Sequence, residues 1–304
     1  MISDHALCGV YAAALTPLQP DGTVDREALP EYLGFLARRG CHGGLVLGTT
    51  GEGPSFSPAE RYAVIQAAVS VRQQYPNFRI LAGTGTPSLD ETTLLTKEAF
   101  DLGVDGVVVL PPYYFKKVSD DGLYEWFRQI IIRSVPHGGY LLGYHIPPMT
   151  GVSLSIELLA RLKDAFPDQF AGLKDSSADP EHAQKLGRVF HKELLVLNGN
   201  DRLFSLALQN QASGCITALA NLSSPLLRQI WNQTNQGEQD LETQNQLDAA
   251  REVLDKYPPA AAFLKEIVHR SYNFPQWGVR RPLLPLSQEL AEEAAAAWMR
   301  LSHV

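Results

Sequence analysis

Cysteine is scarce in this sequence of 304 residues, which contains only Cys8, Cys41 and Cys215. Their odd number and wide spacing argue against a disulfide framework of the kind that holds small secreted domains together. We therefore expect reduced thiols, a cytoplasmic protein, and three cysteines that act as small core residues.

The sequence also lacks long apolar stretches and any excess of positive charge. No apolar run reaches the ~18 residues of a membrane-spanning helix, and residues 1–9 lack the basic and apolar regions of a signal peptide. The net charge of −7 and the isoelectric point near 5.6 argue against nucleic acid or a membrane as the main partner. The remaining composition, 45% hydrophobic and 19% charged, is ordinary for a soluble globular protein.

Short apolar runs alternate along the chain with amphipathic stretches. We expect strands at residues 9–15, 43–47, 79–83, 106–110, 140–144, 170–174, 194–198 and 214–217. We expect helices at residues 26–39, 57–74, 88–102, 120–134, 155–165, 179–191, 201–209 and 225–234. This count and spacing predict an α/β fold of the (β/α)₈, or TIM-barrel, type.

The tail of the chain has a different pattern. Residues 1–234 form the predicted barrel domain, and residues 235–304 read as a helical extension packed on it. Proline-rich segments at 257–259 and 274–285 interrupt the extension.

Lys174 ends the sixth apolar run, where we expect the mouth of the barrel. Desolvation there disfavours a charged ammonium and frees the neutral amine, which attacks a carbonyl and forms a Schiff base. The alternative is a lysine that snorkels at the end of a strand.

Tyr144 ends the fifth run, one strand away from Lys174. A phenol at this place can move a proton to or from a substrate, with Thr49 and Tyr114 as relay. The alternative for Tyr144 is an aromatic side chain that fills the barrel.

The loop after the second run contains Thr49 and Thr50 between glycines, and its backbone N–H groups can hold a carboxylate. A tight structural turn is the alternative. His145 and Asp175 each follow a proposed catalytic residue, so they face away from the barrel centre. No His, Cys, Asp or Glu cluster has the sequence spacing of a metal site, and we expect neither metal nor cofactor.

Three motifs together resemble one known family. They are residues 48–52 (Gly-Thr-Thr-Gly-Glu), Tyr144 and Pro147 with Thr150-Gly151, and Gly172-Leu173-Lys174. This set is similar to the N-acetylneuraminate lyase and dihydrodipicolinate synthase superfamily, whose members are class I aldolases and related lyases acting on pyruvate or other 2-oxo acids. The resemblance runs from about residue 10 to residue 285.

The resemblance implies a role for each matching residue. Lys174 forms the Schiff base with pyruvate and Tyr144 is the general acid/base. Thr49, and Tyr114 reaching in from a neighbouring subunit, complete the proton relay. The remaining implied substrate contacts are Thr49 and Thr50 for the carboxylate, with Gly199 and Ile216 lining the pocket. The family resemblance also implies a homotetramer built as a dimer of dimers.

Departures from the family pattern bear on the aldehyde partner. Met149 stands where dihydrodipicolinate synthases carry an arginine, and Arg202 and Ala218 stand where sialate lyases carry a glutamate and a serine. The segment 48–57 resembles the 2-keto-3-deoxygluconate aldolase branch. We therefore expect a lyase that cleaves a 2-keto-3-deoxy sugar acid, with Met149 and Arg202 at the aldehyde end; Arg202 pairing with an acid on a helix face is the alternative.

Other functions stay open from the sequence. Within the superfamily they are a Schiff-base dehydratase, dihydrodipicolinate synthase and N-acetylneuraminate lyase. From another class, a non-catalytic protein that binds 2-oxo acids is the alternative.

Overall fold

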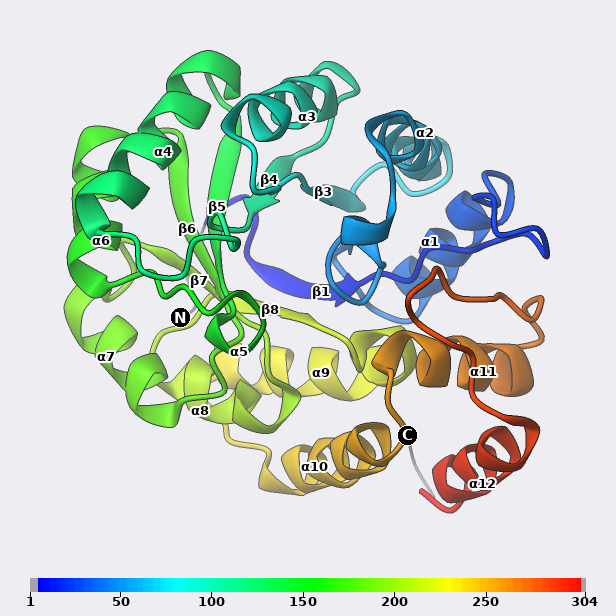
Figure 1. Cartoon of the computed structure of the whole chain (residues 1–304). Coiled ribbons are helices and arrows are strands. Elements are labelled where there is room, and N and C mark those ends of the chain that lie inside the picture. The colour runs from blue at the N-terminus through cyan, green and yellow to red at the C-terminus, as the bar shows by residue number, and fades with distance from the viewer. Residues whose placement is uncertain (1–4, 302–304) are drawn as a thin grey trace.

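The computed structural model describes residues 5–301. Eight parallel strands close into a barrel in sequence order, so that β1 pairs with both β2 and β8 (Figure 1). The strands are β1 (Gly9–Ala13), β2 (Gly43–Val46), β3 (Arg79–Gly83), β4 (Gly106–Val109), β5 (Tyr140–His145), β6 (Phe170–Asp175), β7 (Leu195–Asn198) and β8 (Gly214–Thr217). The predicted (β/α)₈ barrel is confirmed.

Helices surround the barrel and connect its strands (Figure 1). They are α1 (Ala28–Arg38), α2 (Pro58–Val69), α3 (Leu89–Asp101), α4 (Asp120–Ser134), α6 (Ile156–Ala165), α7 (Pro180–Phe190), α8 (Phe204–Gln209) and α9 (Ala220–Asn235), with short helices η1 (Gly53–Ser55), η2 (Ser70–Gln73), α5 (Pro147–Thr150) and η3 (Asp201–Leu203). Serine side chains fix several helix starts. Ser57 forms the predicted capping box with Glu60, and Ser88 and Ser119 accept hydrogen bonds at the starts of α3 and α4.

The strand residues divide between two apolar layers because alternate side chains face opposite sides of the sheet. Leu45, Leu81 and Ile216 belong to the cluster inside the barrel, whereas Val46 and Val107 belong to the layer between barrel and helices. Burial on both faces explains why the strands read as continuous apolar runs. All three cysteines are buried, as predicted.

Two local differences from the prediction have physical causes. The short helix α5 was not predicted, because it is one turn long and carries no apolar periodicity. Helix α9 begins at Ala220 rather than at Pro225; the chain kinks at Ser223, so Pro225 lies within the helical span.

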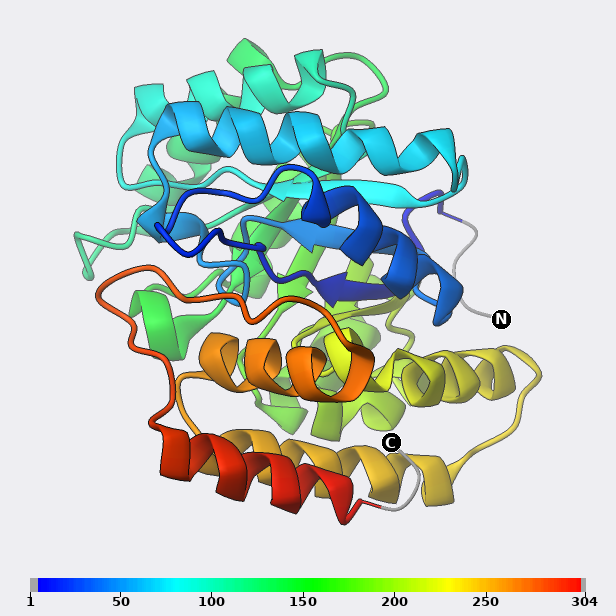
Figure 2. The same ribbon diagram turned by 90° about the vertical axis from the view of Figure 1, so that its right-hand side faces the viewer.

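The predicted C-terminal helices are present as α10 (Leu241–Lys256), α11 (Ala260–Tyr272) and α12 (Gln288–Met299), gathered on one side of the barrel (Figure 2). Phe274 and Trp277, in the segment after α11, pack edge-on against Tyr32 of α1, with ring centroids 5.5 and 5.3 Å away. The last barrel helix ends beside the predicted boundary between residues 234 and 235. Two predictions reach beyond the described residues. The segment 1–9, predicted not to be a signal peptide, includes residues 1–4, and the extension includes residues 302–304. Within 5–301, no helix has the length and apolar character needed to cross a bilayer.

Candidate active site

Lys174 lies on β6 near the C-terminal end of the strand, with Tyr144 of β5 and Leu197 of β7 as its neighbours in register. The strand approaches β7 so closely that a Cβ atom at Gly172 would lie 1.9 Å from the carbonyl oxygen of Leu195. Glycine is therefore required two residues before the lysine. The Lys174 side chain is 2% exposed, which is rare for a lysine.

The Lys174 amine faces a phenol. Its Nζ donates to Tyr144 Oη at 3.1 Å and lies 4.2 Å from the centroid of the same ring. The ion pairs found among residues 5–301 do not include Lys174. The amine is thus not held by a carboxylate, and its surroundings differ from those of a snorkelling lysine.

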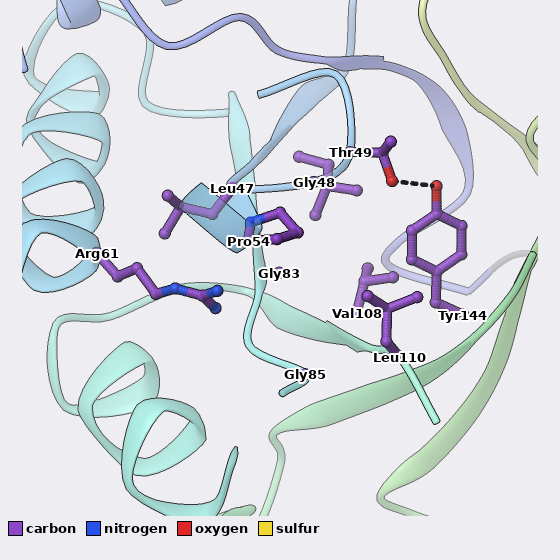
Figure 3. Close-up of a pocket in the computed structure, with 11 residues that line it drawn as sticks. Leu47, Gly48, Thr49, Pro54, Arg61, Gly83, Gly85, Val108, Leu110 and Tyr144 are labelled. Atoms are coloured by element: carbon purple, nitrogen blue, oxygen red, sulfur yellow. Dashed lines mark hydrogen bonds between the residues drawn. The ribbon is translucent and has the colours of Figure 1, made fainter. Parts of the chain in front are cut away.

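Tyr144 connects the amine to the loop after β2. Its Oη lies 3.3 Å from Thr49 Oγ1 (Figure 3). Burial acts to raise the pKa of Tyr144, but the Lys174 charge, and hydrogen bonds with Thr49, Lys174 and Ser176, act more strongly together and lower it. A lowered pKa raises the fraction of Tyr144 that is phenolate near neutral pH, and the phenolate is the form that accepts a proton.

The loop that carries Thr49 and Thr50 has a fixed backbone. Leu47 and Glu52 both have positive φ angles, 59° and 58°. A Cβ atom at Gly53 would lie 1.9 Å from the carbonyl oxygen of Leu47, so the loop folds tightly on itself.

Glu52 anchors this loop to the C-terminal extension. Its Oε1 lies 2.5 Å from Lys265 Nζ of α11, and both side chains are almost fully buried, 0% and 1% exposed. Its Oε2 accepts a hydrogen bond from the backbone N–H of Arg280 at 2.6 Å. The extension therefore helps to hold the loop whose threonine contacts Tyr144.

A pocket opens beside Thr49 and Tyr144 (Figure 3). Its lining is mostly apolar or glycine, with one cation. The residues are Leu45, Leu47, Gly48, Thr49, Pro54, Arg61, Gly83, Gly85, Val108, Leu110 and Tyr144.

Comparison with known proteins identifies the family. The model of the dihydrodipicolinate synthetase family matches residues 6–300. This chain belongs to that family. It is therefore a lyase of the class I aldolase type. The superfamily that the three motifs indicated is confirmed.

Individual relatives span nearly the whole chain. An uncharacterized DapA-like lyase of Chloroflexus aurantiacus is 39% identical over 296 residues, covering 96% of each chain. The crystal structure of dihydrodipicolinate synthase from Agrobacterium tumefaciens is 31% identical, with a TM-score of 0.86 and coverage of 97% and 99%. YagE, a prophage protein of E. coli K12, shares the fold with a TM-score of 0.91 at 23% identity, covering 98% and 99%.

The predicted pocket residues of this family member lie at or near the mouth. Ile216 is fully buried in the inner barrel cluster. Gly199 donates its N–H to the Asp175 carbonyl oxygen at 2.6 Å, and a Cβ atom there would lie 1.9 Å from Ser176 Oγ. Ser176 was not predicted, although it contacts Tyr144; its place two residues after Lys174 at the strand end was the available signal.

Three other predicted residues are not gathered around the amine within one chain. Tyr114 is 75% exposed and Met149, on α5, is 66% exposed. Arg202 forms an ion pair with Asp255 of α10 at 3.2 Å, the alternative that we gave for it.

His145 and Asp175 face away from the pocket, as predicted, and both are buried. No cluster of metal-ligand types was expected from sequence spacing, but the fold brings His182 of α7 beside them. One possible ligand atom from each of the three side chains lies within 4.8 Å of the others. Sequence spacing missed this cluster because its members come from three separate elements.

Proposed function

We propose that this family member forms a Schiff base between Lys174 and the keto carbon of a 2-oxo acid, and cleaves a 2-keto-3-deoxy sugar acid to pyruvate and an aldehyde. The observation that carries the proposal is the Lys174 amine, 2% exposed and 3.1 Å from the phenol of Tyr144. A buried amine with no carboxylate partner can add to a carbonyl, and the adjacent phenol supplies the acid/base.

The proposed reaction needs no other electron acceptor. The Lys174 amine adds to C2 of the keto acid, and the resulting carbinolamine takes up one proton and loses water to give a protonated imine. Tyr144, as phenolate, takes the proton of the C4 hydroxyl while the C3–C4 bond breaks, and the bonding electrons pass into the imine to form an enamine. The aldehyde leaves, C3 takes up the proton that Tyr144 had accepted, which restores the phenolate, and hydrolysis of the protonated imine releases pyruvate, the free amine and one proton. For this reason we propose that no cofactor or metal takes part.

The other proposed roles follow the position of each residue. Thr49 relays the proton, since its hydroxyl contacts Tyr144, and it holds the pyruvate carboxylate together with Thr50. Gly199 and Ile216 are assigned to the substrate space at the barrel mouth, outside the residues that line the pocket beside Thr49. Tyr114 is exposed in one chain, and we propose that it completes the relay of a neighbouring subunit in a homotetramer.

The proposed substrate class depends on the aldehyde end of the site. Met149 offers no charge to an aldehyde carboxylate, which disfavours aspartate semialdehyde. Arg202 is assigned to a hydroxyl or acidic group of the sugar-acid substrate, and must leave Asp255 to meet it. The E. coli neighbour was solved in complex with pyruvate, which is in keeping with pyruvate as the shared component.

Borohydride reduction in the presence of pyruvate tests the imine. The expected result is a covalent adduct on Lys174 that is absent from Lys174→Ala. A substrate panel then tests the second half of the proposal: ketodeoxygluconate should release pyruvate, measured by a coupled dehydrogenase.

Each rival function has its own signature in the same panel. Loss of water without pyruvate indicates the dehydratase, and condensation of pyruvate with aspartate semialdehyde indicates dihydrodipicolinate synthase. Pyruvate released from N-acetylneuraminate indicates the sialate lyase. Binding of pyruvate without a trapped adduct indicates a non-catalytic binding protein.

A further inference from the structure

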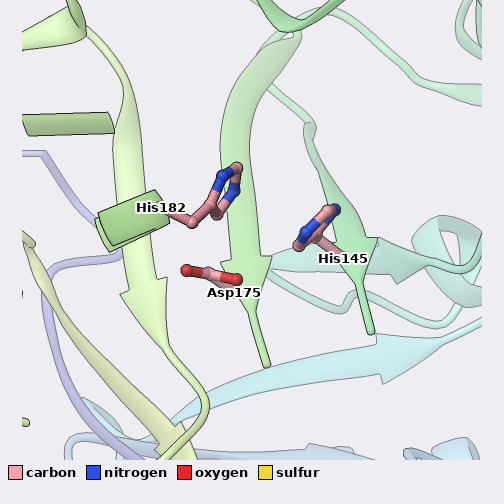
Figure 4. Close-up of side chains that lie close together, drawn as sticks. All are labelled: His145, Asp175 and His182. Atoms are coloured by element: carbon pink, nitrogen blue, oxygen red, sulfur yellow. The ribbon is translucent and has the colours of Figure 1, made fainter. Parts of the chain in front are cut away.

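A polar cluster lies on the outer side of the barrel wall, directly behind the proposed reaction centre. Strands β5 and β6 pair Tyr144 with Lys174, and His145 with Asp175. Because successive strand residues face opposite sides, His145 and Asp175 face the helices, where His182 of α7 joins them (Figure 4). We call these three side chains the rear cluster.

The donor pattern of His145 does not suit a metal ion. The backbone N–H of Leu154 donates to His145 Nδ1 at 3.0 Å, so the neutral ring carries its proton on Nε2. A ligating histidine has the opposite pattern, with one nitrogen bare for the metal and the other donating a hydrogen bond. The rings of His145 and His182 also stack, with centroids 4.6 Å apart and planes at 21°, so their in-plane lone pairs do not converge.

The hydrogen bonds of the rear cluster reach two loops instead. His145 Nδ1 holds Leu154, which closes the segment 146–154 that leaves β5 and contains α5. The carboxylate of Asp175 accepts the backbone N–H of Ser177 at 3.0 Å, in the loop that leaves β6. These two loops carry Met149, at the proposed aldehyde end, and Ser176, which contacts Tyr144.

A backbone hydrogen bond joins the loop after β6 to the last residue of β5, from which the other loop leaves. The N–H of Ser176 donates to the carbonyl oxygen of His145 at 2.8 Å. Burial, followed by the charge of His182, lowers the pKa of His145 to about 4, so its ring is neutral near pH 7 and Nδ1 stays an acceptor. His145 Nδ1 is therefore free to accept the Leu154 N–H near pH 7.

We infer that the rear cluster positions the aldehyde end of the site, by holding the loops after β5 and β6 from behind. His145 and Asp175 are positioning residues: they touch no substrate, and they act through Met149 and Ser176. This inference rests on the proposed function, because it assigns those two loops to the cleavage half of the reaction rather than to imine formation.

The test uses a matched pair of variants in the full-length chain. His145→Leu removes the acceptor of the Leu154 N–H, whereas His145→Asn keeps one, because the asparagine Oδ1 can take the place of Nδ1. We expect kcat/KM for ketodeoxygluconate cleavage to fall about ten-fold or more in His145→Leu, the size typical of a buried donor that loses its partner. His145→Asn should recover most of this loss.

The second readout separates positioning from a general structural role. The rate of borohydride trapping with pyruvate should stay within about two-fold of wild type in both variants, because Lys174 and Tyr144 are held by the strands. Asp175→Ala and Asp175→Asn form an independent pair. Asp175→Ala removes the acceptor of the Ser177 N–H and should lower cleavage but not trapping, whereas Asp175→Asn keeps an acceptor and should recover most of the loss.

The outcomes distinguish the two proposals. A wild-type protein that traps no pyruvate contradicts the proposed function itself. Normal trapping in wild type, with equal cleavage by His145→Leu and His145→Asn, overturns the positioning role alone. Equal losses of trapping and cleavage, or unfolding of both His145→Leu and Asp175→Ala seen by circular dichroism, assign the cluster to barrel stability and likewise overturn it.

Discussion

The buried ion pair between Glu52 and Lys265 offers the sharpest stability prediction. Replacing Lys265 with methionine keeps the side-chain volume but leaves the Glu52 carboxylate without its cation. The carboxylate then retains the hydrogen bond from the Arg280 N–H. Both charged side chains are at most 1% exposed. Breaking such a pair by removing one partner costs about 3–5 kcal/mol, because an uncompensated charge stays buried. We therefore expect Lys265→Met to lower the free energy of unfolding by about that amount.

The double variant Glu52→Gln/Lys265→Met removes both charges and should be more stable than Lys265→Met alone. The measurement is urea denaturation of each variant at pH 7. Lys256→Met is a matched control, since the Lys256–Glu252 pair is 62% and 66% exposed and spans 3.6 Å; its unfolding curve should overlay that of wild type. A loss below about 1 kcal/mol in Lys265→Met, or a double variant no more stable than Lys265→Met, would show that the Glu52 charge is not stranded in the interior.

The remaining predictions concern the reaction. Tyr144→Phe should lower kcat by about a hundred-fold or more with little change in pyruvate affinity, measured by steady-state kinetics and pyruvate titration; an equal loss of both removes the acid/base role. The pKa of Tyr144 is lowered from 10.0, so the pH–rate profile should show a rise with pH that is centred below pH 10 and reports formation of the phenolate. Tyr144→Phe should abolish this rise, and a rise centred at or above pH 10 contradicts the prediction. Arg202→Ala should raise KM for the sugar acid without changing borohydride trapping, and an unchanged KM leaves Arg202 with its Asp255 pair alone.

Much of the fold was predictable because a parallel barrel has strong local signals. Each strand is buried on both faces and reads as an apolar run, and Ser57 with Glu60 marks a helix start in the sequence itself. The neighbourhood of Tyr144 and Lys174 was also predictable, since consecutive strands of such a barrel lie side by side and both residues lie one position before the ends of their strands.

The unpredicted features depend on contacts between distant parts of the chain. Glu52 meets Lys265 across 213 residues of sequence, and neither position has a local pattern that announces the pair. His182 stands on an amphipathic helix, where its meeting with His145 depends on how α7 rotates against the barrel. The start of α9 was misplaced because Pro225 was read as a first-turn residue, whereas the kink at Ser223 lets it lie inside.

The account depends most on the nucleophilic amine of Lys174. The direct measurement is mass spectrometry of the protein after borohydride treatment with pyruvate, followed by peptide mapping. We expect one reduced pyruvate adduct per chain on Lys174, and we expect it to be lost in Lys174→Ala while the fold is kept. A protein that binds pyruvate but carries no adduct, or carries it on another lysine, contradicts the proposed mechanism.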